Sequence, residues 1–436
     1  MNISIIGTGY VGLVSGVGFA KHGHEVICVD IDEEIVDSIN NSVPPIYEEG
    51  LEELLEKVVD SGNLSATTDL ESAVEKTDIT FICVGTPSRK DGSIDTSAIE
   101  IAAEDVSEAL DEKDEYHIVV VKSTVTPGTT DGMVKPLLES KGKTVGEDFG
   151  LGMNPEFLRE GVALNDFLDP DRIVIGGWDE KSRETIKQVY ESFDAPKLVT
   201  DIRTAEMIKY TSNALLATKI SFANEMSRLC EEVGIDVYDV MDGVGLDHRI
   251  NRDFLNAGPG FGGSCFPKDV KAIKNLAKEN DIEPELLESV LAINRQQPIH
   301  TVEILEKYLG SLKGKDITVL GLTFKGGTDD IRETRALPIV ESLLKKGANV
   351  TGYDPKGMDN FSELISGITY ADSIEESLTD AEACIIQNDW AKFDELEGED
   401  FDVMKDKVVL DGRRVLDEDK LGKDITYLTV GRGKVD

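Results

Sequence analysis

Short apolar runs, separated by segments with apolar residues at helical spacing, make up roughly the first 195 residues. Strand-length runs that alternate with helical patterns predict βαβ units and a parallel sheet. This part of the chain is therefore expected to form a Rossmann-like, doubly wound α/β domain. The strands are expected at residues 3–6, 26–29, 79–84, 117–122, 151–154 and 172–175.

The pattern changes near residue 204, and apolar residues then recur at helical spacing without strand-like runs. Residues 205–234 predict a single helix of about 30 residues. The glycine-rich stretch 258–263 and Pro284 are expected to interrupt this helical region. We therefore expect a central all-helical domain with one long helix.

Alternating runs return from residue 315, with a helix expected over 336–346, so a second Rossmann-like α/β domain follows. The fold class is therefore α/β, with two doubly wound domains joined by a helical one. The expected domain boundaries are 1–198, 199–312 and 313–436.

Charge adds a functional constraint. The chain has 45 Lys and Arg against 85 Asp and Glu, so its formal net charge is -40, spread along the chain. Such a field disfavours nucleic acid and anionic membranes as partners. Because the Debye length falls to roughly 3 Å at 1 M salt, we interpret the charge as salt adaptation, as in halophilic proteins, with an ordinary acidic cytosolic protein as the alternative.

No apolar run reaches the roughly 18 residues that a membrane span needs. The N-terminus lacks the basic region of a signal peptide and reads as a strand followed by a turn. We expect a cytoplasmic protein without a membrane partner.

The five cysteines form no CxxC pair, which argues against a disulfide framework or a metal site. Cys28, Cys83 and Cys384 lie in strand-like apolar runs and Cys230 in a helical stretch, so these four are expected to be buried. Cys265 instead follows a glycine-rich loop in GPGFGGSCFPKD, where core packing is not expected.

The motif at residues 7–12, Gly7-Thr8-Gly9-Tyr10-Val11-Gly12, follows a predicted strand and opens a predicted helix. In this context GxGxxG favours a dinucleotide, with Gly7 for the turn, Gly9 for close approach of the pyrophosphate and Gly12 for helix–strand contact. Asp30 ends the next strand, where its carboxylate can bind a ribose 2′-hydroxyl and repel a 2′-phosphate. NAD is therefore favoured over NADP.

Polar residues follow other predicted strands. Thr86 comes after one strand, Ser123 and Thr124 come after another, and ligands of open parallel sheets bind at these ends. Glu156 and Glu160 follow a third strand and would share one face if that stretch were helical. Their position makes them candidates for a general base.

Two further candidates are Lys209 and Asn213, which are four residues apart on the long helix and can stabilise a developing oxyanion. Cys265 is followed by Lys268 and Asp269, and a nearby cation favours the reactive thiolate. A reactive loop thiol in a chain that binds NAD indicates aldehyde oxidation through a thiohemiacetal and a thioester.

Seven motifs in order resemble the UDP-glucose/GDP-mannose 6-dehydrogenase family over nearly the whole chain. They are GTGYVG, VGTP with DGSID, STVTPGT, NPEFLREG with DFLDPDRIVIG, AEMIKYTSNA, FLNAGPGFGGSCFPKD and FKGGTDDIRE. The resemblance implies an NAD-binding N-terminal domain, a central dimerisation domain and a C-terminal nucleotide-sugar-binding domain. It also implies oxidation of a C6 alcohol to a carboxylate with two NAD, in glycan or polysaccharide synthesis.

For catalysis, the resemblance implies that Cys265 is the nucleophile of the second oxidation. Lys209 and Asn213 would stabilise the developing charge on oxygen. By the same resemblance Asp269 with Thr124 would hold a water or relay a proton, Glu156 would be the base for thioester hydrolysis, and Glu160 would support it.

For binding, the resemblance completes two sets of residues. The cofactor set is Gly7, Gly9, Tyr10, Val11, Gly12, Asp30, Thr86, Ser123, Thr124, Glu160, Lys268 and Arg332. The nucleotide-sugar set is Phe157, Leu158, Arg159, Lys209, Asn213, Arg249, Phe254, Leu255, Asn256, Gly258, Gly262, Phe324 and Lys325, and Arg332 belongs to both sets. Arg249 is expected to reach the substrate of a neighbouring subunit in a dimer or larger homo-oligomer.

UDP-glucose is the expected substrate and UDP-glucuronate the product. Other nucleotide sugars, GDP-mannose or a UDP-N-acetylhexosamine, stay open, although NPEFLREG argues against the UDP-N-acetylmannosamine branch. A two-electron hydroxyacid dehydrogenase of similar layout is a further alternative, which Cys265 argues against. The chain departs from the family pattern at Ile35, where many relatives carry a basic residue that helps to hold the adenosine ribose. This departure bears on the affinity for NAD and not on the preference for NAD over NADP.

Overall fold

A computed structural model describes residues 1–433 of the chain. Internal contacts divide it into two units, Met1–Ser212 and Asn213–Asp436, and each is described by itself. The three expected domain boundaries remain predictions.

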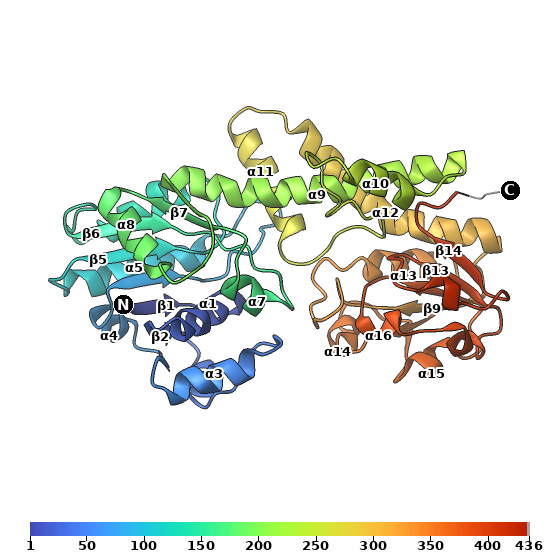
Figure 1. Ribbon diagram of the computed structural model, residues 1–436, viewed down its shortest axis with the longest axis horizontal. Coiled ribbons are helices and arrows are strands. Elements are labelled where there is room, and N and C mark those ends of the chain that lie inside the picture. The colour runs from blue at the N-terminus through green and yellow to red at the C-terminus, as the bar shows by residue number, and fades with distance from the viewer. Residues whose placement is uncertain (434–436) are drawn as a thin grey trace. The chain divides into compact units, whose positions relative to one another are not determined.

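The first unit is built on an eight-stranded sheet in the order β3-β2-β1-β4-β5-β6-β7-β8, whose first six positions have the Rossmann order. Figure 1 shows helices on both faces of this sheet. The strands are β1 (Asn2–Ile6), β2 (Glu25–Val29), β3 (Leu64–Thr67), β4 (Ile79–Ile82), β5 (His117–Val121), β6 (Phe149–Met153), β7 (Ile173–Gly177) and β8 (Lys197–Thr200).

All six predicted strands of this unit are confirmed, but β3 and β8 were not predicted. Both are edge strands of four residues with mixed burial, so neither shows the continuous apolar run of a central parallel strand. The predicted parallel sheet is confirmed except at one pair, because β6 and β7 run antiparallel.

Two apolar layers flank the sheet. Helices α1, α3, α7 and α8 pack on one face and α4, α5 and α6 on the other, since successive strand residues point to opposite sides. The helices are α1 (Tyr10–Lys21), α2 (Glu33–Asn40), α3 (Leu51–Asp60), α4 (Leu70–Glu75), α5 (Ser97–Asp111), π-helix η1 (Thr130–Val134), α6 (Lys135–Leu138), α7 (Ala163–Leu168) and α8 (Glu180–Val189).

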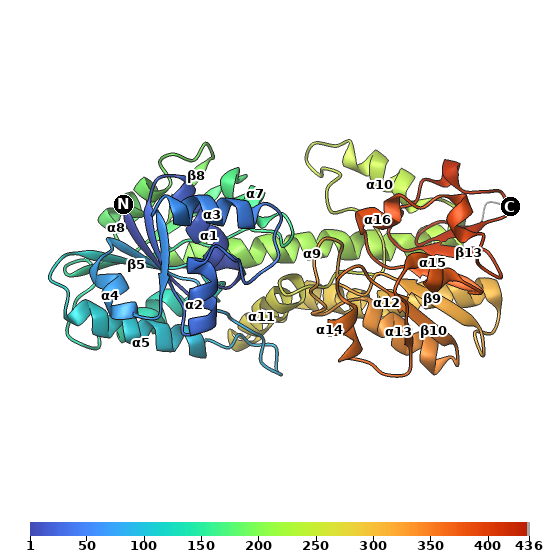
Figure 2. The ribbon, with the colours of Figure 1, turned by 90° about the horizontal axis from the view of Figure 1, so that it is seen from below.

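The predicted long helix is confirmed as α9 (Ile202–Val233), which has 32 residues and is drawn in green in Figures 1 and 2. It is followed by α10 (Val237–Gly245), α11 (Phe266–Glu279) and α12 (Glu285–Leu309). The glycine-rich loop and Pro284 separate these helices, as the sequence predicts.

The second unit contains a six-stranded, wholly parallel sheet in the order β11-β10-β9-β12-β13-β14, which is again the Rossmann order. Helices α12 and α13 cover one face, and α15 and α16 cover the other. Its strands are β9 (Asp316–Leu320), β10 (Asn349–Tyr353), β11 (Thr369–Tyr370), β12 (Ala383–Ile386), β13 (Val408–Asp411) and β14 (Thr426–Thr429). Its remaining helices are α13 (Ala336–Lys345), α14 (Met358–Ser362), α15 (Ile374–Leu378), α16 (Ala391–Asp394), η2 (Gly398–Phe401) and η3 (Glu418–Lys420).

Among residues 1–433, no helix has the length and apolar character needed to cross a bilayer.

Candidate active site

The turn between β1 and α1 has the features of a dinucleotide site. Gly7 has a φ of 89°, and a Cβ on Gly12 would lie 1.8 Å from the Gly7 carbonyl oxygen, so both positions require glycine. Helix α1 has no side-chain cap and no acid in its first turn, whereas Asp32 and Asp179 cap α2 and α8. The first N–H groups of α1 are thus available for a phosphate.

Asp30 lies directly after β2 beside this turn. One carboxylate oxygen accepts hydrogen bonds from Thr8 N at 2.9 Å and Thr8 Oγ1 at 2.5 Å, and the other accepts from Asp32 N at 3.2 Å. Because two carboxylate oxygens accept about four hydrogen bonds, Asp30 retains capacity for a ribose hydroxyl. The turn and Asp30 together fit NAD.

Tyr10 supports this turn from within the protein. Its hydroxyl donates to Glu48, and Glu48 also accepts from Gly161 N at 2.9 Å and Leu164 N at 3.3 Å. Glu48 thereby ties the start of α1 to the loop before α7. Glu48 could not be found from the sequence, because its partners Tyr10 and Gly161 lie 38 residues before it and 113 residues after it along the chain.

The predicted polar residues after β4 and β5 hold two loops together. Ser123 Oγ donates to Val84 O at 2.7 Å, and Thr86 Oγ1 donates to Thr124 O at 3.0 Å. Thr124 is half-buried in the segment that follows β5. These residues therefore form one edge of the candidate site.

Glu156 and Lys209 form a buried ion pair. Glu156 is 8% exposed and Lys209 3% exposed, and Lys209 Nζ donates to Glu156 Oε1 at 2.9 Å. Burial favours the protonated form of Glu156, but the Lys209 ammonium and the Leu158 N–H outweigh it and hold the pKa of Glu156 below its usual value. Glu156 is therefore an ionised carboxylate near neutral pH.

The segment that carries Glu156 and Glu160 is not helical. Residues 154–160 form a loop after β6, so the condition for a shared helical face is not met. Glu156 and Glu160 therefore do not share a helical face.

Phe157 on this loop has two cations near its ring. The Arg172 guanidinium is 3.9 Å from its ring centroid, and Lys209 Nζ is 5.4 Å from it. Arg172 was not predicted, although it occurs in the DFLDPDRIVIG motif. Its stacking fixes the direction of the Phe157 ring.

The second unit carries the other catalytic candidates. Asn213 Nδ2 donates to Asp269 Oδ2 at 2.6 Å, and Lys268 Nζ donates to Asp269 Oδ1 at 2.7 Å. Asp269 is buried and Cys265 is exposed. Lys268 is thus paired with Asp269, and its role as the cation that favours the Cys265 thiolate stays a prediction.

Cys265 occupies the N-cap position of α11, which has no side-chain cap. The other four cysteines are buried, as predicted. Burial raises the pKa of Cys28 and of Cys83 to about 12 and raises that of Cys230, so these thiols are inert. Cys265 is the one cysteine placed for nucleophilic chemistry.

The glycine-rich loop before Cys265 packs against the loops of the second sheet. A Cβ on Gly262 would lie 2.4 Å from Glu333 O, and one on Gly258 would lie 2.7 Å from Gly412 O. Arg413, which was not predicted, donates to Gly260 O at 2.8 Å. Glycine at positions 258 and 262 is therefore required for the packing of this loop. This structural role is separate from any contact that the two residues make with a ligand.

The predicted nucleotide-sugar arginines are each held by an aspartate. Arg159 pairs with Asp166 at 2.6 Å, Arg249 with Asp247 at 2.5 Å and Arg332 with Asp330 at 2.6 Å. All three guanidinium groups are largely exposed and can exchange an aspartate for a phosphate or carboxylate.

Other predicted substrate residues differ in accessibility. Leu255 packs in the core near α10, so its side chain is not available to a ligand, which corrects that prediction for the side chain. Phe254 has a φ of 64°, and Asn256 is exposed. Lys325 Nζ lies 5.7 Å from the Phe324 ring centroid. Leu158 is half-buried against the core of the first unit.

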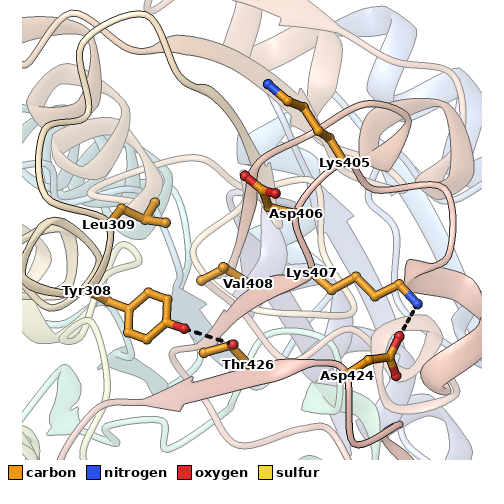
Figure 3. Close-up of a pocket in the computed structure, with 8 residues that line it drawn as sticks. All are labelled: Tyr308, Leu309, Lys405, Asp406, Lys407, Val408, Asp424 and Thr426. Carbon is orange, nitrogen blue, oxygen red and sulfur yellow. Dashed lines mark hydrogen bonds and ion pairs between the residues drawn. The ribbon is translucent and has the colours of Figure 1, made fainter.

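A surface hollow of the second unit lies elsewhere, at the start of β13 and β14 (Figure 3). Ligands of open parallel sheets bind at the opposite, carboxyl ends. Lys405 pairs with Glu382 at 3.2 Å and Lys407 pairs with Asp424. The hollow is therefore not the candidate active site. Its lining is Tyr308, Leu309, Lys405, Asp406, Lys407, Val408, Asp424 and Thr426.

Three models of one family match consecutive parts of the chain. The NAD binding domain matches residues 1–194, the central domain 203–296 and the UDP binding domain 318–418. The chain belongs to the UDP-glucose/GDP-mannose dehydrogenase family. The family prediction and the three-domain architecture are thereby confirmed, and the protein is an NAD-dependent oxidoreductase.

The relatives are similar over nearly full length. A UDP-glucose 6-dehydrogenase of the halophilic archaeon Haloferax volcanii is 45% identical and spans 95% of this chain and 97% of its own. A UDP-glucose 6-dehydrogenase of Bacillus subtilis is 43% identical and spans 99% of this chain and 94% of its own. The solved structure of a UDP-glucose dehydrogenase from Pyrobaculum islandicum has a TM-score of 0.92 at 43% identity and covers 99% of this chain and 98% of its own.

Proposed function

We propose that the protein oxidises UDP-glucose to UDP-glucuronate in two steps that each reduce one NAD. The observation that carries this proposal is an exposed thiol, Cys265, at the uncapped N-terminus of α11 in an NAD-dependent dehydrogenase. A two-electron alcohol oxidation needs no nucleophile, whereas oxidation of an aldehyde to a carboxylate does. Bound NAD supplies the hydride acceptor.

In the first oxidation, the C6 hydroxyl must lose a proton as hydride leaves the same carbon. Asp269 with Thr124 is proposed to take that proton, directly or through a water. Lys209 and Asn213 lie four residues apart on α9, so their polar groups occur on one helix face. A cation and an amide N–H there stabilise the developing alkoxide.

In the second oxidation, the Cys265 sulfur bonds to the aldehyde carbon and makes it tetrahedral. Loss of hydride from that carbon leaves a thioester, and water then cleaves the carbon–sulfur bond to give the carboxylate and the free thiol. The dipole of α11 favours the thiolate, because Cys265 lies at the positive end of a 14-residue helix.

Glu156 is proposed as the base for thioester hydrolysis. Its ionised state at neutral pH lets it accept a proton from the attacking water. The Lys209 ammonium is proposed to interact with both the Glu156 carboxylate and the substrate oxygen that gains negative charge. Glu160 is proposed as a supporting carboxylate on the same loop.

The identity of the sugar is supported by the relatives. The curated relatives at 40–45% identity are named UDP-glucose 6-dehydrogenases. The solved UDP-D-ManNAc dehydrogenase of Pyrococcus horikoshii has a TM-score of 0.87 but is 31% identical, covering 100% of both chains. A screen of UDP-glucose, GDP-mannose and UDP-N-acetylhexosamines that records NADH per sugar consumed tests the proposal. Oxidation of another sugar in preference to UDP-glucose would contradict it.

Cofactor preference depends on Asp30. With NADP, its carboxylate would face a phosphate, and like charges about 4 Å apart near a protein surface repel by roughly 4 kcal/mol. We expect kcat/KM for NAD to exceed that for NADP by about 100-fold or more, and Asp30→Ala to relax this ratio. Asp32→Ser is the matched control, because serine also caps α2 and should leave the ratio unchanged. Equal use of both cofactors by the native enzyme would refute the role of Asp30.

The oligomer is proposed to be a homodimer or larger, formed through α9. Leu215, Phe222 and Leu229 are spaced by seven residues along this helix and are 60%, 47% and 57% exposed. Apolar residues at this spacing are typical of a helix that packs against a second helix.

Leu229→Glu combined with Phe222→Asp should halve the mass measured by light scattering. Lys57→Glu, at an exposed position of α3 and away from this stripe, should not. A monomeric native protein would contradict this proposal.

The net charge of -40 is proposed to be a salt adaptation, which the Haloferax volcanii relative supports. Raising KCl from about 0.1 M to about 2 M should raise both the melting temperature and kcat, because screening weakens repulsion between the acidic side chains. Differential scanning fluorimetry and NADH absorbance measure the two quantities. Activity that declines steadily above 0.1 M salt would contradict the prediction.

A cytoplasmic location is also proposed, supported by the five free cysteines.

A further inference from the structure

Lys122 is a buried lysine that the proposed mechanism does not use. It is the first residue after β5, directly before Ser123 and Thr124, and is 3% exposed. It therefore lies at the carboxyl end of the sheet, where ligands of this fold bind.

Two neutral groups hold its ammonium. Lys122 Nζ donates to Asn154 Oδ1 at 2.8 Å and to the Tyr190 hydroxyl at 3.4 Å. Tyr190 donates to the same Asn154 oxygen at 2.5 Å, and Asn154 Nδ2 donates to Val174 O at 2.8 Å. Asn154 begins the loop that carries Glu156, so Lys122 connects that loop to β5.

The charge balance around Lys122 is unusual. Within the described residues, no carboxylate is hydrogen-bonded to Lys122, while Glu156 nearby is already paired with Lys209. Two buried ammonium groups therefore accompany one buried carboxylate. A buried cation without a bonded counter-ion costs stability and is retained where it serves another purpose.

A second buried lysine shows what a structural role looks like. Lys113 Nζ donates to the carbonyl oxygens of Val74 and Glu75 at 2.7 and 3.1 Å, and it also bonds Thr77 O. Removing it would leave these carbonyls at the end of α4 without their partner. Removing Lys122 would leave Asn154 Oδ1 bonded to Tyr190, so nothing is orphaned.

We propose that Lys122 is a positioning residue for the thioester hydrolysis: it holds the Glu156 loop through Asn154, and it gives the Glu156–Lys209 pair an excess positive charge that stabilises the anionic transition state. Fixed charge in a buried site acts without reorganisation and needs no contact with the substrate. This inference rests on the proposed function of Glu156.

The titration of Lys122 provides the test. Burial lowers its pKa to about 8, while the charges of Glu156 and Cys83 raise it and that of Lys209 lowers it. Tyr190 also faces it and stays neutral, because burial raises the pKa of that phenol. Lys122 is thus a cation below about pH 8 and neutral above, and the contribution of its charge to the rate should disappear across that pH, while the neutral amine can still donate to Asn154.

The experiment compares Lys122→Met with the native enzyme at a series of pH values, with UDP-glucose and NAD. The native-to-variant ratio of kcat should be about tenfold near pH 6.5 and fall toward one above about pH 9, with KM little changed. The ratio cancels ionisations that both enzymes share. Tyr190→Phe keeps the cation, so its ratio to the native enzyme should not vary with pH.

Stability supplies a readout that a structural lysine would not give. Folding lowers the pKa of Lys122 from 10.5, so the native enzyme gains stability as pH rises from about 8 to 10.5. At pH 7, Lys122→Met should melt at a higher temperature than the native enzyme, and its stability should not rise further between about pH 8 and 10.5. The control Lys113→Met should melt at a lower temperature than the native enzyme, and its ratio of activity to the native enzyme should not change with pH. Lys122→Gln replaces the methionine variant if that is insoluble.

A ratio for Lys122→Met that stays constant with pH, or a lower melting temperature like that of Lys113→Met, would overturn the inference. A native enzyme without activity on UDP-glucose would instead overturn the proposed function, and the melting temperatures would still report on Lys122.

Discussion

Cys265→Ala is expected to abolish formation of UDP-glucuronate and to leave at most one NADH per sugar. Without the sulfur, the aldehyde carbon has no nucleophile to make it tetrahedral before hydride leaves, so the uronate rate should fall by about 10³-fold or more. Cys265→Ser should be almost as slow, because a hydroxyl is far less acidic than a thiol. Coupled NADH absorbance and chromatography of the nucleotide sugars measure both products.

The matched control is Cys230→Ala, which removes a buried thiol from α9 in the same unit. It should keep a stoichiometry of two NADH per sugar, with a modest loss of stability from the small cavity. Normal two-NADH turnover by Cys265→Ala would show that Cys265 is not the nucleophile of the second oxidation.

Glu156→Gln is expected to stall the enzyme after both hydride transfers. The amide keeps the shape of the side chain and can accept from Lys209, but it cannot take a proton from water. Thioester hydrolysis should therefore slow by about 10²- to 10⁴-fold, while the thioester still forms. Stopped-flow absorbance should show a rapid burst of two NADH per active site, followed by slow turnover.

The double variant Glu156→Gln with Cys265→Ala is the control for this burst. Without the thiol no thioester can form, so any burst should be limited to one NADH per site. A single Glu156→Gln variant with native steady-state turnover would show that Glu156 is not the base.

The sequence was most informative where burial is continuous. Central strands such as β4 and β5 are buried at every residue and mostly apolar, since both faces of a parallel sheet are covered, and α9 has an uninterrupted helical pattern. The edge strands β3 and β8 have mixed burial and were missed. The i, i+4 spacing of Glu156 and Glu160 has meaning only in a helix, and the loop at residues 154–160 shows that such spacing alone does not predict one.

The candidate site shows a similar division. Gly7, Asp30 and Cys265 stand out because a local motif explains each one. Three residues were missed because the partner of each lies in a distant segment of the chain. Lys122 bonds to Asn154, Glu48 accepts from Tyr10, and Arg172 stacks on Phe157. The pairing of Lys268 with Asp269 was also invisible, since adjacent residues in a sequence give no indication of side-chain direction.

The most direct test of the four-electron mechanism is the mass of the stalled enzyme. Glu156→Gln is mixed with UDP-glucose and NAD, quenched in acid, and examined by intact-protein and peptide mass spectrometry. The mechanism predicts a UDP-glucuronyl adduct in thioester linkage on the peptide that contains Cys265, released by hydroxylamine, and none in the Cys265→Ala double variant. An unmodified Cys265 after a burst of two NADH would contradict it.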